Sequence, residues 1–68
     1  MNYAYSLQYR DDAGRRHCVE FDSSLTPSKL RVEIGRSRHT GSPLTVIDRD
    51  LGVTHKFRGE AVISVEAI

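Results

Sequence analysis

The first third of the chain alternates between apolar and polar side chains. From Tyr3 to Tyr9 every odd position is aromatic or leucine, while the even positions are small or polar. The alternation returns between His17 and Phe21, after residues 11–14, whose Asp and Gly residues suit a tight turn. Successive side chains of a strand point to opposite faces, so this period of two predicts two half-buried strands. The pattern therefore predicts an N-terminal β-hairpin.

The next segment carries three agreeing signals for the start of a helix. Thr26 is a good N-cap, a proline follows at the first helical position, and Leu25 is placed to pack against Leu30. The residues after Leu30 also alternate in the manner of a strand over five positions. The start signals favour a short helix over residues 27–36, followed by a polar loop up to Pro43. A strand here would instead give a small all-β barrel.

The second half of the chain predicts three more strands. Residues 44–47 are rich in β-branched side chains, residues 49–52 suit a turn, and residues 53–58 alternate again. A break at residues 59–60 leads into a last alternating run over residues 61–68. The predicted order is ββαβββ, an α+β fold with a small antiparallel sheet of about five strands and one short helix.

The predicted core takes one face of each strand and one face of the helix. Its expected members are Tyr5, Leu7, Val19, Phe21, Leu30, Ile34, Val46, Phe57, Ile63 and Val65. No linker interrupts the pattern, so one domain is expected over residues 1–68. A small open sheet leaves edge strands unpaired, which favours a homodimer formed through a sheet edge.

Size and composition narrow the function. The chain has 68 residues, 38% of them hydrophobic, and a formal net charge of +1. A domain of this length buries only about 60% of its unfolded surface, so little apolar surface remains to line a pocket. We expect no cofactor and no small-molecule substrate. The balanced charge also argues against a protein that binds nucleic acid over its whole surface.

The cysteine count and the hydropathy pattern indicate the compartment. Cys18 is the single cysteine, so no disulfide forms within the chain, which fits a reducing cytoplasm. No apolar run reaches the roughly 18 residues of a membrane span, and the N-terminal segment lacks the features of a signal peptide. We expect a cytoplasmic protein without a membrane partner.

No residue pattern supports an enzyme or a metal site. His17 and Cys18 are neighbours on a predicted strand and point to opposite faces, so they cannot form a nucleophile and base pair. No two of the histidines and the cysteine stand two to four residues apart, as metal ligands commonly do. We therefore expect a non-enzymatic protein without a metal.

The most suggestive chemistry is a basic segment that contains a single acid, Glu33. Its candidate partner-binding residues are Lys29, Arg31, Arg36, Arg38 and His39. On the predicted boundaries, the last two project from the loop after the helix. The hypothesis is a small interaction protein that acts by stoichiometric binding to a protein or ribonucleoprotein with an acidic or RNA-lined surface. A solvated, charge-balanced helix face is the alternative without a partner.

A second hypothesis is a dimeric nucleic-acid-binding module that uses the same arginine-rich segment. Further contacts would come from Arg15 and Arg16, and from bases stacked on Tyr3, Tyr5 and Tyr9. The competing use of these tyrosines is packing in the core or in a dimer interface, because Leu7 lies in the same row.

At the level of pattern the chain resembles small phage-encoded inhibitors of the anti-CRISPR type. The resemblance rests on the hairpin over residues 3–21, the helix entry over residues 24–28, and the second hairpin with its terminal strand over residues 44–68. It implies inhibition of a host protein or ribonucleoprotein complex, in the host cytoplasm if the chain is phage-encoded. It assigns no individual residue. Residues 21–31 are also locally similar to the hairpin-to-helix step of actinobacterial nucleoid-protein dimerisation domains.

Overall fold

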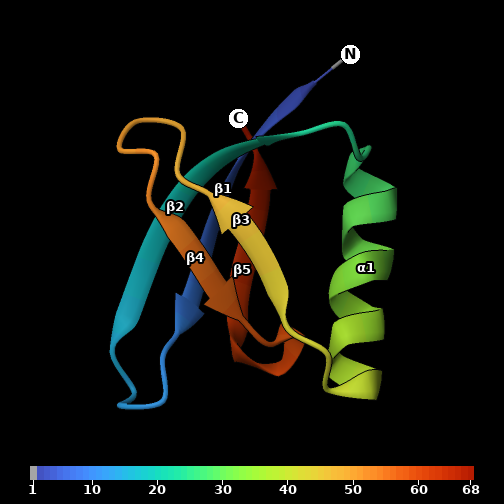
Figure 1. Cartoon of the computed structure of the whole chain (residues 1–68). Coiled ribbons are helices and arrows are strands. Elements are labelled where there is room, and N and C mark those ends of the chain that lie inside the picture. The colour runs from blue at the N-terminus through green and yellow to red at the C-terminus, as the bar shows by residue number, and fades with distance from the viewer. Residues whose placement is uncertain (1) are drawn as a thin grey trace.

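Five strands, one α-helix and one short 3-10 helix follow one another along the chain (Figure 1). The structure is a computed structural model and describes residues 2–68. The elements are β1 (Tyr3–Arg10), β2 (Arg16–Ser23), α1 (Pro27–Thr40), β3 (Leu44–Ile47), β4 (Thr54–Phe57), the 3-10 helix η1 (Gly59–Ala61) and β5 (Val62–Ala67). The predicted α+β class and the order ββαβββ are confirmed.

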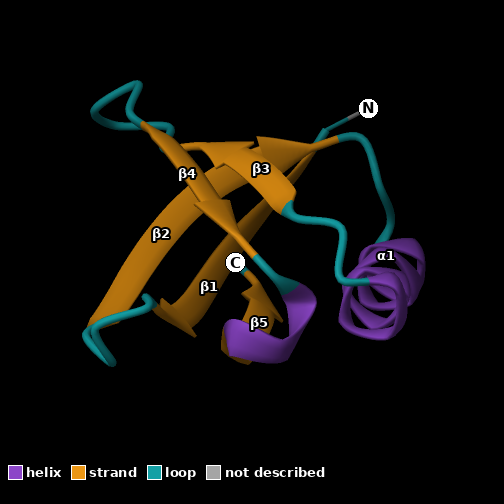
Figure 2. Ribbon diagram, turned by 60° about the horizontal axis from the view of Figure 1, so that its bottom comes forward, coloured by secondary structure: helices purple, strands orange, loops and turns teal. Residues whose placement is uncertain are grey.

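The five strands form two antiparallel sheets instead of one. The larger sheet has the order β2-β1-β5, and β3 pairs only with β4. Figure 2 shows the β3–β4 hairpin lying across one face of the larger sheet, with α1 seen end-on beside both. The Arg49 amide at the hairpin turn donates to the Glu20 carbonyl of β2 at 2.9 Å, which ties the sheets together at one corner. The sheet does not close, so the all-β barrel is wrong.

The core lies between the larger sheet on one side and the hairpin with α1 on the other. Its buried apolar residues are Tyr5, Leu7, Tyr9, Val19, Phe21, Leu30, Ile34 and Phe57. Seven of the ten predicted core residues are therefore confirmed. Val46 and Val65 are half-buried against this cluster, whereas Ile63 is 44% exposed.

A β-bulge in β5 explains why Ile63 leaves the core. Gln8 of β1 pairs with Ser64, but the next residue, Tyr9, pairs with Val62. Ile63 is thus an extra residue that the ladder does not pair, and the alternation of β5 changes phase across it. Val62 takes the inward place that the alternating pattern assigned to Ile63.

The helix starts where the sequence predicts and ends later. Thr26 caps it, with its hydroxyl accepting from the Lys29 amide at 3.4 Å. It runs for 14 residues, so the predicted end at Arg36 is wrong and residues 37–40 are the last helical turn, not a loop. Gly41 ends it in the left-handed conformation with φ 78°, which glycine adopts without steric cost.

One buried polar junction holds the C-terminal half of α1 against η1. The Ser37 hydroxyl donates to the Ser42 carbonyl and accepts from the Gly59 amide at 2.8 Å. Gly59 is itself buried. A Cβ on Gly59 would overlap the Ile34 carbonyl oxygen and stand 2.6 Å from the Arg38 backbone nitrogen. Only glycine therefore allows η1 to approach the helix this closely.

We expect Gly59→Ala to lower the free energy of unfolding by about 3 kcal/mol, because its methyl group meets helix backbone that cannot rotate away. Urea denaturation followed by circular dichroism measures the effect. Gly35→Ala is the matched control, since open space surrounds its Cβ position and alanine favours a helix interior by roughly 1 kcal/mol. Equal stability of the two variants would contradict the close approach at Gly59.

Candidate functional site

The helical period divides the basic segment into separate surfaces. Arg31 and Arg38 are seven residues apart and share one flank of α1, which lies beside β5. Both are exposed. Since the helix continues to Thr40, Arg38 projects from the last helical turn and not from a loop.

The other basic residues of the segment face elsewhere. Lys29 and Arg36 share the opposite flank of the helix with Glu33, and the Arg36 guanidinium lies 3.4 Å from the Glu33 carboxylate. His39 is exposed in the last turn, outside both flanks. The five predicted partner-binding residues are therefore not one surface, and a single internal acid already pairs with one of them.

A hollow of about 280 Å³ lies between the first flank and β5. We call this surface the α1–β5 face, and its lining residues are Arg31, Ile34, Gly35, Arg38, Val62, Ile63, Ser64 and Val65. The two arginines stand on its helical side, and the strand supplies apolar side chains and a serine. β5 is an edge strand of the larger sheet, with β1 on its one paired side.

The charge of the α1–β5 face is not compensated within the described residues. Neither Arg31 nor Arg38 has a carboxylate oxygen within 4.0 Å anywhere in residues 2–68. Glu66 lines a smaller neighbouring hollow with Arg31, but the two form no ion pair. This face therefore presents two open guanidinium groups beside an apolar floor.

The tyrosines of the nucleic-acid hypothesis are placed in the core. Tyr5 and Tyr9 are buried, and the Tyr5 hydroxyl donates to the Leu25 carbonyl at 2.5 Å. Tyr3 is half-buried and packs against the same cluster. These rings point to the covered face of the sheet, so Tyr5 and Tyr9 have no free face on which a base could stack.

The remaining residues of that hypothesis lie at the far end of the β1–β2 hairpin. Arg15 and Arg16 are exposed at the start of β2. Neither lines the α1–β5 face. The structure therefore does not join them with the helix arginines into one basic surface.

A cluster of aromatic and titratable side chains surrounds Tyr9 and was not anticipated from the sequence. The Tyr9 ring stacks on His17 and on Phe57, with centroid distances of 5.1 and 4.6 Å. The Tyr9 hydroxyl lies 2.7 Å from Nδ1 of His55, and Nε2 of His17 lies 2.8 Å from the Asp11 carboxylate. The register of the β1–β2 hairpin places Tyr9 opposite His17, so this contact could have been predicted from the sequence. The contact with His55 depends on the tertiary fold, because His55 lies on a distant strand.

The pKa shifts of Asp11 and Tyr9 fit a structural role for this cluster. The hydrogen bond from His17, helped by the backbone amide of Arg15, lowers the pKa of the Asp11 carboxyl. Burial raises the pKa of Tyr9, and the nearby Asp11 charge raises it further. Tyr9 thus stays protonated as a hydrogen-bonding phenol. Within the part of the chain that the structure describes, no three His, Cys, Asp or Glu side chains form a metal site.

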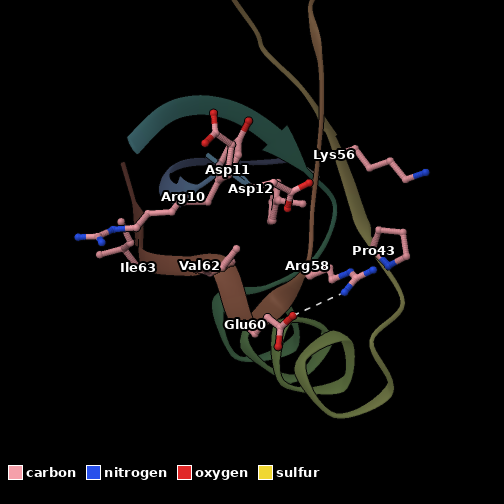
Figure 3. Close-up of a pocket in the computed structure, with 12 residues that line it drawn as sticks. Arg10, Asp11, Asp12, Pro43, Lys56, Arg58, Glu60, Val62 and Ile63 are labelled. Carbon is pink, nitrogen blue, oxygen red and sulfur yellow. Dashed lines mark ion pairs between the residues drawn. The ribbon is translucent and has the colours of Figure 1, made fainter. Parts of the chain in front are cut away.

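A larger hollow of about 700 Å³ lies where β1, β4 and η1 meet (Figure 3). Around it the close-up places three bases and three acids: Arg10, Lys56, Arg58, Asp11, Asp12 and Glu60. Arg58 lies 3.8 Å from Glu60 and pairs with it. The opposed charges leave no dominant sign of potential for a charged partner.

A third hollow, of about 550 Å³, separates α1 from β3 and has walls of apolar core side chains. Its two rim acids, Glu33 and Asp22, already face Arg36 and Arg49 at 3.4 and 3.9 Å. The α1–β5 face is thus a hollow whose charged side chains are all positive and, among residues 2–68, have no carboxylate partner within 4.0 Å.

We expect acid to destabilise the fold in part through Asp11. Its folded pKa lies below the usual 3.8, so its contribution is complete above that value and is lost as the pH falls through the folded pKa. Asp11→Asn should flatten the stability curve below about pH 4, as urea denaturation at a series of pH values would show. Asp12→Asn is the control, because the Asp12 carboxylate makes no hydrogen bond or ion pair within residues 2–68. A slope unchanged by Asp11→Asn would contradict this role.

Comparison with known proteins adds no family to this picture. No protein-family model, curated protein or solved structure matches the chain. Among residues 2–68 no helix has the length and apolar character needed to cross a membrane. The resemblance to small phage-encoded inhibitors therefore stays a prediction, and the functional argument rests on the geometry of the α1–β5 face.

Proposed function

We propose that this protein is a non-enzymatic interaction protein that binds stoichiometrically to an acidic surface of a partner protein through the α1–β5 face. The observation that carries the proposal is the pair Arg31 and Arg38, exposed on one flank without an acid partner in residues 2–68. An inhibitor of a host protein or ribonucleoprotein complex, as the sequence resemblance implies, would be one form of such a binder.

The chemistry of the two arginines supports a carboxylate-bearing partner. Their side chains leave the helix about 10.5 Å apart along its axis, seven residues at about 1.5 Å each. Each planar guanidinium offers a fork of N–H donors that matches a carboxylate with two parallel hydrogen bonds. Two such contacts with fixed spacing favour one orientation of the partner and speed the encounter.

The alternative of nucleic-acid binding has less support from the same geometry. Affinity for phosphate grows with the number of neutralised phosphates, and the α1–β5 face brings two arginines together. The tyrosines that would add base stacking are buried or half-buried. Binding to a nucleic acid is therefore the alternative result of the test below, and it would overturn this proposal.

Charge reversal on one flank tests the proposed function. We expect Arg31→Glu/Arg38→Glu to reduce recovery of specific partners from a lysate of the source cells at least tenfold, which corresponds to about 1.4 kcal/mol of binding. Lys29→Glu/Arg36→Glu is the matched control, because it reverses the same number of charges at the same spacing on the opposite flank. Quantitative mass spectrometry after nuclease treatment measures recovery, and circular dichroism verifies folding.

The same experiment separates the alternatives. If both variants recover the same proteins as the native chain, the α1–β5 face is not the binding surface. If nuclease removes the captured material, and the native chain binds duplex or single-stranded oligonucleotides with strong salt dependence, the protein binds nucleic acid instead.

A further inference from the structure

We infer, on the basis of the proposed function, that the α1–β5 face takes an extended segment of its partner in which one apolar side chain stands between two carboxylates. The carboxylates would pair with Arg31 and Arg38. The apolar side chain would enter the hollow between them and contact β5. The ligand class is therefore an acidic peptide with a central apolar residue, which is more specific than the acidic surface that the charge of the face predicts.

The absence of a side chain at Gly35 creates the place for the apolar group. Gly35 lies between the two arginines on the same side of α1 and lines the hollow with them. Apart from its chain neighbours and the backbone of its own helix, no heavy atom of residues 2–68 stands within 4 Å of the position that its Cβ would occupy. A glycine in a helix interior costs roughly 1 kcal/mol relative to alanine. At Gly59 a close neighbouring backbone requires glycine, but at Gly35 no neighbour among residues 2–68 explains why glycine replaces a better helix former.

The bulge in β5 supplies the apolar floor. Ile63 is the residue that the ladder leaves unpaired, and it lines the hollow while remaining 44% exposed. Val65, two positions on, is half-buried and lines the same hollow. Bulges commonly re-aim a side chain beside a functional site. Covering Ile63 would recover apolar burial that the free protein lacks.

The spacing of the charges selects the form of the ligand. In an extended chain, residues i, i+2 and i+4 point to the same side and span about 13 Å. The two arginines leave the helix about 10.5 Å apart, and their long flexible side chains can take up the difference. The pattern acid-x-apolar-x-acid therefore presents all three groups to the face at once.

A second copy of this chain is a poor occupant of the same face. A symmetric contact would bring the Arg31 and Arg38 side chains of both copies together, and among residues 2–68 Glu66 is the single acid that lines this hollow or the adjoining one. Juxtaposed like charges disfavour such a pairing. The uncompensated charge instead favours a different, acidic protein.

Peptide binding tests the inference with a defined probe. The probe is fluorescein-labelled, amidated Ser-Glu-Ser-Leu-Ser-Glu-Ser, titrated with the native protein and followed by fluorescence anisotropy. We expect at least tenfold weaker binding when Leu is replaced by Ser, or when both Glu residues are replaced by Gln.

Filling the hollow should have the same effect without removing an arginine. Gly35→Leu is expected to weaken binding of the Leu probe at least tenfold while keeping the helix, because leucine is a better helix former than glycine. Val32→Leu is the matched control, since Val32 is exposed and lies outside the hollow. Thermal denaturation verifies that both variants fold.

The outcomes separate this inference from the proposed function. If the Leu and Ser probes bind equally well and Gly35→Leu binds like the native protein, while Arg31→Glu/Arg38→Glu does not bind, acid recognition stands and the apolar subsite is overturned. Failure of every peptide to bind also overturns the inference, whereas the lysate experiment decides the proposed function independently. A concentration-dependent dimer in sedimentation that Arg31→Glu/Arg38→Glu abolishes would assign the face to a second copy.

Discussion

The buried contact between Ser37 and Gly59 is the constraint on which the placement of the functional face depends. The Ser37 hydroxyl satisfies a carbonyl after the helix and an amide of η1, and Gly59 removes the Cβ that would push the two backbones apart. A buried polar group without a partner is costly, so this junction has one well-defined geometry. It sets the distance between the end of α1 and the start of β5, and so the width of the hollow that Arg38 and Ile63 line.

The α1–β5 face combines two features that each carry a small cost in stability with two charges that are unpaired among residues 2–68. Gly35 weakens the helix, the bulge exposes Ile63, and two arginines stand without internal acids. Elsewhere some charges are paired internally: Arg36 faces Glu33, and the Asp11 carboxylate bonds to His17 and accepts from an amide of its own turn. A domain of this size has little room for a pocket, so binding by its outer surface is the mode that its dimensions favour. The costs are concentrated where such binding would offset them.

Much of the fold could be predicted because its signals are local. The hairpin over residues 3–21 follows from alternation and a turn, and the start of α1 follows from Thr26 and the proline after it. The predicted end of the helix is wrong, although Gly41 is a common stop signal, because the residues between Arg36 and Gly41 are polar and resemble a loop. With that end in place, the helical period alone would have separated Arg31 and Arg38 from the other bases.

The sequence by itself determined which residues share a face of each element, because side-chain direction follows from the local period of two or 3.6 residues. Only the tertiary structure decided which faces are covered. It buries Tyr9 in the core and places its hydroxyl within hydrogen-bonding distance of His55 on a distant strand. It also decided the bulge at Ile63 and the division into two sheets. These depend on packing between segments far apart in the chain, where the gain comes from jointly excluding water and satisfying buried polar groups. No local sequence pattern predicts this gain in free energy. The α1–β5 face, which forms between two distant segments, could therefore not be predicted from the sequence.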